Sequence, residues 1–332
     1  MSGCRHAESQ LKPLFGARDY ITGRHFTIAR CGGCGLAMTI PPPPAREMAA
    51  YYPAGYYGAP GERRFPAPVE YLQKKLYEFR VRRVESVAGI RRGRVLDVGC
   101  GRGGLLQAFR RRGWEVQGTE LSDQAAAYAR QVLQLPVAIG SLETLDLPSG
   151  HFDAVTLWHV LEHLPDSEVL LAEVRRLLKP DGVLLVGVPN FGGWESRFCR
   201  DKWFHLDVPR HLNHFTKAAL RQALSEAGFR DRSWSGFAPE YDAYSFVQSS
   251  LNRCGLCQNL LYNWLRGGRA KIIESDAGLE WQKVAVVLLA LPLGLVSLPF
   301  TTCAGLANQA GTMSVLASVE RLRQSPSPRS QC

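Results

Sequence analysis

Apolar and polar positions alternate with two different periods along the middle of the chain. Short apolar runs, typical of buried strands, occupy residues 94–98, 114–119, 137–139, 152–158, 183–188 and 229–234. Stretches with helical spacing separate them, and the clearest begins at Ser167 and places Leu170, Leu171, Val174 and Leu177 on one face. Strands that alternate with helices predict an α/β fold with a doubly wound, parallel sheet.

Capping residues mark the ends of these predicted helices. Ser122 or Asp123 can cap one helix, and Thr216 can cap another that ends at Gly228. A further helix is expected at residues 69–88.

The alternation stops after Trp234. Val247, Leu251, Cys254, Leu261 and Trp264 fit one face of a single long helix, and residues 312–319 fit a last strand. Between them, residues 284–300 are almost wholly apolar but contain two prolines. We expect an apolar helical insertion that either dips into one membrane leaflet or covers the sheet or a substrate tunnel.

The N-terminal segment carries its own candidate chemistry. The spacing Cys31-Gly-Gly-Cys34 is typical of a zinc knuckle, because glycines let two thiolates point inward. The predicted tetrahedral zinc site consists of Cys4, His6, Cys31 and Cys34; the alternative is a ribbon without metal. A second pair, Cys254 and Cys257, falls within a helical pattern, and we interpret it as part of that helix.

The amino-acid composition limits the classes of protein to which the chain can belong. The 332 residues are 45% hydrophobic and 21% charged, which is typical of a globular protein and excludes a disordered one. Nine cysteines and no recognisable signal peptide favour the reducing cytoplasm. Most of the net charge of +10 comes from Leu72–Arg112, with twelve basic residues and three acidic ones. This stretch indicates either solvated helix faces or a surface for anionic lipid, nucleic acid or a phosphorylated substrate.

A glycine-rich run after the first predicted core strand fits two cofactor patterns. Gly99, Gly101 and Gly104 match the dinucleotide pattern G-x-G-x-x-G, with Glu120 at the distance of a ribose-binding acid. The same run matches the D-x-G-x-G-x-G pattern of an S-adenosylmethionine site. Asp97 favours the second pattern, because a carboxylate there would repel a pyrophosphate but attract a sulfonium or an α-amino group.

Several further motifs resemble the class I S-adenosylmethionine-dependent methyltransferase superfamily, near its ubiquinone-type O-methyltransferases with an N-terminal C-x-x-C-G segment. They are Leu96–Gly103, Glu120–Ser122, Phe152–Leu164, Leu178–Gly182, Val188–Asn190 and Pro209–Phe215. The resemblance implies a Rossmann-like sheet that is parallel except for its antiparallel last strand.

The resemblance also implies roles for single residues. Asp97, Gly99, Gly101 and Gly103 would line the methionine end of S-adenosylmethionine, and Glu120 would bind both ribose hydroxyls. Ser141 and Leu142 would contact adenine, whereas Trp158 and His159 would flank the reacting end.

Histidines are the candidate bases. His159 is expected to line the pocket, and His211 or His214 to take a proton from an acceptor hydroxyl. The alternative is a structural loop in which Arg210 pairs with Asp207. The pattern H-x-x-E-H at residues 159–163 also matches a zinc peptidase, but its histidines follow a strand directly, so we expect His163 to cap or pack against the next helix.

The resulting organisation has six parts. They are a zinc-ribbon-like segment (1–45), a linker with cap helices (46–90), a methyltransferase core (91–240), the insertion (241–307), the last core strand (308–323) and a disordered tail (324–332).

The expected activity is O- or C-methylation of a small molecule, a sugar or a lipid-linked acceptor, by a cytoplasmic enzyme peripheral to the inner face of the cell membrane. One alternative is an RNA methyltransferase, which the basic stretch favours, although the Asn-Pro-Pro-Tyr type of motif is absent. The other is a zinc-dependent or membrane-anchored interaction protein with a vestigial fold.

Overall fold

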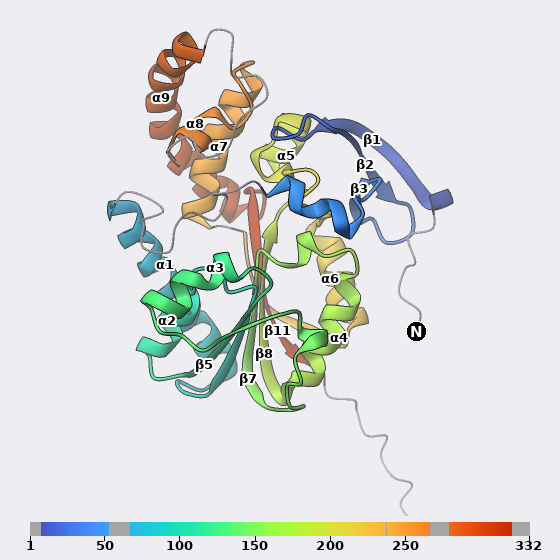
Figure 1. Ribbon diagram of the computed structural model, residues 1–332, viewed down its shortest axis with the longest axis vertical. Coiled ribbons are helices and arrows are strands. Elements are labelled where there is room, and N and C mark those ends of the chain that lie inside the picture. Colours follow the sequence, from blue (N-terminus) through green and yellow to red (C-terminus); the bar gives the residue numbers. More distant parts are fainter. Residues whose placement is uncertain (1–7, 53–66, 237, 266–278, 321–332) are drawn as a thin grey trace, which may run out of the picture.

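Two β-sheets and a helical hairpin make up the protein (Figure 1). The structure is a computed structural model that describes residues 8–52, 67–236, 238–265 and 279–320. The predicted tail and part of the N-terminal segment lie outside these residues.

The larger sheet has seven strands in the order β10-β11-β8-β7-β4-β5-β6. The five neighbouring strands β8, β7, β4, β5 and β6 run parallel to one another. Strand β11 is antiparallel to both of its neighbours, β8 and β10. Their bounds are β4 Arg94–Val98, β5 Glu115–Glu120, β6 Val137–Ile139, β7 Phe152–Trp158, β8 Leu178–Pro189, β10 Phe229–Ser235 and β11 Thr312–Val319. The predicted fold class and the antiparallel last strand are therefore confirmed.

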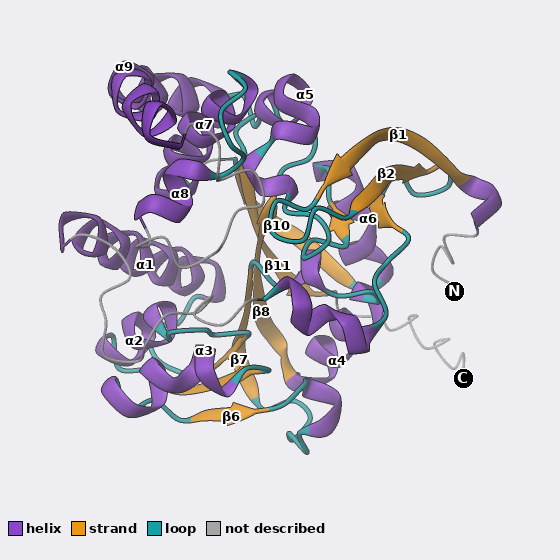
Figure 2. Cartoon of the chain, turned by 45° about the horizontal axis from the view of Figure 1, so that its top comes forward, coloured by secondary structure: helices purple, strands orange, loops and turns teal. Residues whose placement is uncertain are grey.

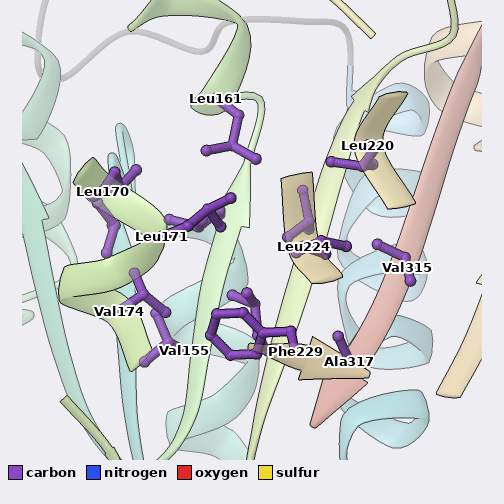
Figure 3. Packing of buried hydrophobic residues seen from close by; sticks show 14 of the residues in the cluster. Val155, Leu161, Leu170, Leu171, Val174, Leu220, Leu224, Phe229, Val315 and Ala317 are labelled. Atoms are coloured by element: carbon purple, nitrogen blue, oxygen red, sulfur yellow. The ribbon is translucent and has the colours of Figure 1, made fainter. Parts of the chain in front are cut away.

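Helices cover both faces of this sheet. Helices α4 (Ser167–Leu177) and α6 (Lys217–Glu226) pack on one face, and α1 (Ala67–Ala88) and α2 (Gly104–Arg111) pack on the other. Figure 3 shows Leu171 of α4 and Leu224 of α6 against the strands. Successive strand residues alternate between the two apolar clusters, so the central strands are buried on both sides.

Helix caps follow the sequence pattern. The Ser122 hydroxyl accepts from the Ala125 N–H at 3.2 Å at the start of α3 (Asp123–Ala127), which continues as a π-helical turn, Tyr128–Val132. The Thr216 hydroxyl accepts from the Ala219 N–H at 3.2 Å in the same way. Short 3-10 helices lie at η1 Glu8–Gln10, η2 Ala45–Tyr51, η4 Leu142–Thr144, η5 Leu161–His163, η6 Arg200–Lys202 and η7 Phe204–Leu206.

The smaller sheet joins the N-terminal segment to a distant part of the chain. Its antiparallel strands β1 (Leu11–Arg18), β2 (His25–Cys31) and β3 (Ala37–Ile40) pair in order, and β3 also pairs with β9 (Asn213–His214). The sequence pattern did not predict a strand at residues 213–214. The pairing brings the N-terminal segment beside α5 (Trp194–Cys199) in Figure 1.

Three helices precede the last strand: α7 (Pro239–Arg253), α8 (Leu260–Leu265) and α9 (Leu279–Leu306). The prediction of a single helix through residue 264 is wrong, because α7 ends at Arg253 and a turn with positive φ at Gly255 and Asn259 follows. Cys254 and Cys257 lie in this turn and not in a helix. Helix α9 packs beside α7, away from the large sheet (Figures 1 and 2).

Candidate active site

The glycine-rich turn between β4 and α2 has a left-handed backbone at three positions. The φ angles are +65° at Gly99, +50° at Gly101 and +73° at Gly103. A Cβ at position 99 would lie 2.8 Å from Val160 Cγ2, whereas position 101 faces open space. Glycine is therefore required by conformation at all three sites, and the backbone at Gly101 is accessible to a ligand.

Gly104 serves packing. A Cβ there would lie 2.5 Å from Tyr77 Cε2 on α1. The glycine that completes the dinucleotide pattern thus allows α1 and α2 to approach each other closely.

Asp97 at the end of β4 is a buried carboxyl group. It is 3% exposed, and its Oδ1 accepts from the Thr156 hydroxyl at 2.5 Å. Burial is the main reason that the pKa of Asp97 is raised to about 7; the Thr156 hydrogen bond opposes this rise, and the nearby Glu120 adds to it. A cationic ligand group would favour the ionised carboxylate here.

Glu120 at the end of β5 is held in one orientation by the backbone. Its Oε2 accepts from the Gly101 N–H at 3.0 Å, and its Oε1 accepts from the N–H groups of Leu121 at 2.8 Å and Ser122 at 3.1 Å. The carboxylate therefore ties β5 to the glycine turn and remains half-exposed beside it. This geometry suits an acceptor of hydrogen bonds from ligand hydroxyls.

The expected adenine loop follows β6. The Gly140 N–H donates to the Glu120 carbonyl at 3.0 Å, which places Ser141 next to the end of β5. The Leu142 side chain is buried in the core, so only its backbone could face a ligand. The adenine contact stays a prediction.

Trp158 and His159 close the opposite side, at the end of β7. The Trp158 ring covers Gly187, where a Cβ would lie 2.6 Å from Trp158 Cε3. The Arg80 guanidinium of α1 lies 3.8 Å from the Trp158 ring centroid. The His159 ring also contacts the Tyr241 ring of α7, with centroids 4.7 Å apart. Residues of β7, β8, α1 and α7 therefore meet here.

Polar atoms at this junction lack partners. Within the described part of the chain, Trp158 Nε1 and His159 Nε2 are buried and form no hydrogen bond. His159 Nδ1 lies 2.8 Å from Glu162 Oε1. Burial, assisted by Arg80, lowers the pKa of His159 to about 3, so the ring is neutral at neutral pH. A bound molecule could satisfy both orphaned atoms.

The other predicted bases lie in different surroundings. His211 Nδ1 donates to the His205 carbonyl at 2.8 Å, and the His205 ring stacks beside His159 with centroids 6.3 Å apart. The structure therefore brings His211 near the His159 group. His214 does not join them, because it lies in β9 with its Nε2 2.9 Å from the Thr39 hydroxyl.

Two neighbouring side chains have structural partners. Arg210 is fully buried and pairs with Asp207 at 2.8 Å and with Asp19 at 2.9 Å, so the ion pair considered as an alternative is present. His163 does not cap α4, whose N-cap residue is Asp166. Its Nδ1 donates instead to the Arg210 carbonyl at 2.9 Å.

The predicted zinc ligands are described only in part. Cys31 is buried and Cys34 is half-buried against the core, while Cys4 and His6 lie outside the described residues. The zinc ribbon stays a prediction.

Sequence reasoning missed several residues that surround Trp158 and His159. Arg80, His205, Glu240 and Tyr241 come from three separate segments, and Arg80 forms a buried ion pair with Glu240. No local pattern marks them. The neighbouring Glu162 does belong to a recognisable motif, the H-x-x-E-H spacing. The sequence analysis interpreted only the two histidines of that motif.

Comparison with known proteins agrees with this geometry. Residues 69–233 match the family model for a methyltransferase domain. The chain is 36% identical over 127 residues to the ubiquinone biosynthesis O-methyltransferase of Alkalilimnicola ehrlichii, covering 35% of this chain and 51% of that protein. It is 30% identical over 195 residues to the 2-methyl-6-phytyl-1,4-hydroquinone methyltransferase of Synechocystis sp., covering 56% and 57%.

The chain thus spans about half the length of the curated relatives it matches. Among solved structures, a SAM-dependent methyltransferase from Archaeoglobus fulgidus aligns with a TM-score of 0.45 at 22% identity, over 74% of this chain and 94% of that one. The dinucleotide alternative is set aside by the family match. Residues 69–233, about half of the chain, thus match the methyltransferase-domain family, and the curated relatives support a class I S-adenosylmethionine-dependent methyltransferase.

Proposed function

We propose that the protein transfers a methyl group from S-adenosylmethionine to a small-molecule acceptor. The observation that carries this proposal is the pair of carboxylates, Asp97 and Glu120, on either side of the glycine turn. Asp97 suits the α-amino group of the cofactor, and Glu120 suits its ribose hydroxyls. A pyrophosphate would be repelled by Asp97, whereas a ribose-binding acid such as Glu120 suits either cofactor.

Methyl transfer is an in-line displacement, so its rate depends mainly on how the reacting atoms are positioned. The neutral His159 can accept a hydrogen bond at Nε2 from an acceptor hydroxyl. With its pKa lowered to about 3, His159 is a weak base. Its proposed role is therefore to orient the hydroxyl rather than to remove its proton.

We infer that the acceptor is an aromatic ring with a hydroxyl group. The Tyr241 ring supplies an aromatic surface beside His159, which suits stacking against a flat ring. The two named relatives act in ubiquinone biosynthesis and on a hydroquinone, which agrees with this class. A panel of hydroquinones, catechols and sugars, assayed for methyl transfer, distinguishes the classes.

We further propose that α9 contacts the inner face of the cell membrane. Glu280–Leu306 has a window of mean hydropathy 2.3, and only 17% of that window is buried. The helix therefore does not cover the sheet, as one of our alternatives required. Helix α1, which like α9 contacts α7, adds the exposed side chains Tyr71, Leu72 and Lys75. Apolar groups beside lysines suit an anionic lipid surface.

An RNA acceptor has less support. Within the described residues, Arg80, Arg94 and Arg112 of the basic stretch pair with Glu240, Glu115 and Glu85 respectively. Three of the twelve basic residues are thus paired with acidic groups of the protein itself.

Calorimetric titration tests the proposed cofactor. We expect S-adenosylmethionine and its demethylated product to bind one to one, and NAD not to bind. Glu120→Ala should weaken binding by on the order of 10-fold or more, because hydrogen bonds to a charged group contribute about 1.5–3 kcal/mol. Glu168→Gln, an exposed change on α4, is the matched control. Binding of NAD in place of both methyl compounds would overturn the proposal.

A further inference from the structure

Glu162, His163 and His211 form a cluster beside the proposed acceptor site. One ligand atom from each of the three lies within 4.8 Å of the others. Glu162 and His163 belong to η5, and His211 comes from the segment between η7 and β9. The fold therefore brings two imidazoles and a carboxylate together from separate parts of the chain.

Backbone carbonyl groups fix how the two histidines face each other. His163 Nδ1 donates to the Arg210 carbonyl at 2.9 Å, and His211 Nδ1 donates to the His205 carbonyl at 2.8 Å. Because each Nδ1 is engaged, Nε2 is the nitrogen left for a ligand on both rings. The rings meet edge to face with centroids 4.7 Å apart. Such carbonyl partners are the usual outer support of metal-binding histidines.

The third member of the cluster is a buried carboxyl group with an unused oxygen. Glu162 is 1% exposed, and its Oε1 bonds to His159. Within the described residues, its Oε2 has no hydrogen-bond partner. A buried acceptor without a donor is costly, so a cation at this point would stabilise the arrangement.

We propose that Glu162, His163 and His211 bind one Zn²⁺ ion. Two imidazole nitrogens and one carboxylate oxygen form a common protein ligand set of catalytic zinc, in which the fourth position stays open for water or substrate. Magnesium is disfavoured, since it prefers oxygen ligands. A proton shared among the same three groups is the competing explanation, and metal binding decides between them.

The position of this cluster gives the ion a role at the acceptor side. Glu162 bonds through Oε1 to His159, so an ion on Oε2 would fix the orientation of that imidazole indirectly. The open coordination position can take an oxygen atom from water or from a hydroxylated molecule. Metal binding itself does not depend on methyl transfer, so the two proposals can fail separately.

Cobalt substitution of the full-length protein tests the site. The chain is stripped with a chelator and titrated with Co²⁺, whose visible absorption reports its ligands. We expect one ion per chain with a tetrahedral or five-coordinate spectrum and no thiolate charge-transfer band from this site. Zn²⁺ should displace the Co²⁺. A thiolate band that disappears in Cys31→Ser would come from the N-terminal ribbon and is counted separately.

Variants locate the ligands. Glu162→Gln and His211→Ala should each weaken metal binding by on the order of 100-fold or more, and His25→Ala, at an exposed position, should not change it. Circular dichroism of each metal-free variant shows whether it folds, and wild-type titration decides the question if one does not. Absence of a nitrogen-and-oxygen cobalt site in the wild-type protein, or its persistence in folded Glu162→Gln, would overturn the proposal.

Discussion

At the scale of single residues, the proposed cofactor site contains a carboxyl group, Asp97, that the fold removes from water. Asp97 accepts a hydrogen bond from the Thr156 hydroxyl, and burial is the main reason that its pKa is raised to about 7. The group is therefore divided between its neutral and ionised forms near neutral pH. Only the ionised form can pair with the α-amino group of S-adenosylmethionine.

We therefore expect the affinity for S-adenosylmethionine to rise as the pH increases from about 6 to about 8. Binding requires a carboxylate, and below the pKa each pH unit lowers its population about tenfold. Asp97→Asn should bind weakly and lose this pH dependence, whereas the exposed Asp146→Asn should keep it. Calorimetric titration at several pH values measures the effect, and a wild-type affinity that is constant over this range contradicts it.

At the scale of elements, the buried acid Glu195 joins α5 to α7, and a second buried acid, Asp242, binds the backbone at the start of α7. Glu195 accepts from the hydroxyl groups of Ser245 and, at 2.7 Å, Ser249 on α7. Asp242 accepts from the Ala238 N–H at 2.6 Å. Burial raises the pKa of Glu195 to about 7 and that of Asp242 to about 8. The folded protein therefore keeps protons that the unfolded chain releases.

This difference sets the sign of the pH dependence of stability. Between the ordinary carboxyl range near pH 4 and about pH 8, these two acids hold more protons in the folded state, so their contribution to the free energy of unfolding should fall as the pH rises. The buried histidines, whose pKa values burial lowers, contribute with the opposite sign below about pH 6.5. Glu195→Gln, which mimics the neutral acid, should remove on the order of 3 kcal/mol of that decrease. Denaturant unfolding at about pH 5 and pH 8 measures it. Glu168→Gln on the exposed face of α4 is the control, and an equal decrease in both variants would refute the assignment.

At the scale of the whole molecule, the protein consists of a sheet core and an apolar helix, α9, that lies outside this core. Helix α9 lies against α7 and presents side chains such as Leu291, 72% exposed, and Leu295, 76% exposed. The position of α9 in Figures 1 and 2 agrees with a surface that faces a lipid leaflet.

We expect the full-length protein to float with vesicles of anionic phospholipid. The double variant Leu291→Glu, Leu295→Glu should reduce the fraction of protein bound to the vesicles by on the order of 10-fold, because it removes the apolar contacts of about two side chains. Val132→Glu combined with Val169→Glu makes the same charge change at exposed positions on other elements. Equal loss of binding in the two double variants would indicate charge repulsion rather than contact through α9.

Local sequence determined the core of the fold. Strands β4, β6, β7 and β11 occupy the predicted residues, because period-two burial, helix caps and glycine turns are short-range properties. The cofactor choice was also local, since Asp97 and the three glycines stand within seven residues of one another.

Tertiary structure decided the rest. The two-residue strand β9 exists because β3 pairs with it, and His163 turns toward the Arg210 carbonyl instead of α4. The acceptor side assembles Arg80, His159 and Tyr241 from three distant segments. No pattern along the chain records such contacts, because they depend on how the elements pack. The sequence thus determined the sheet and its cofactor edge, and packing alone determined what surrounds the reacting end.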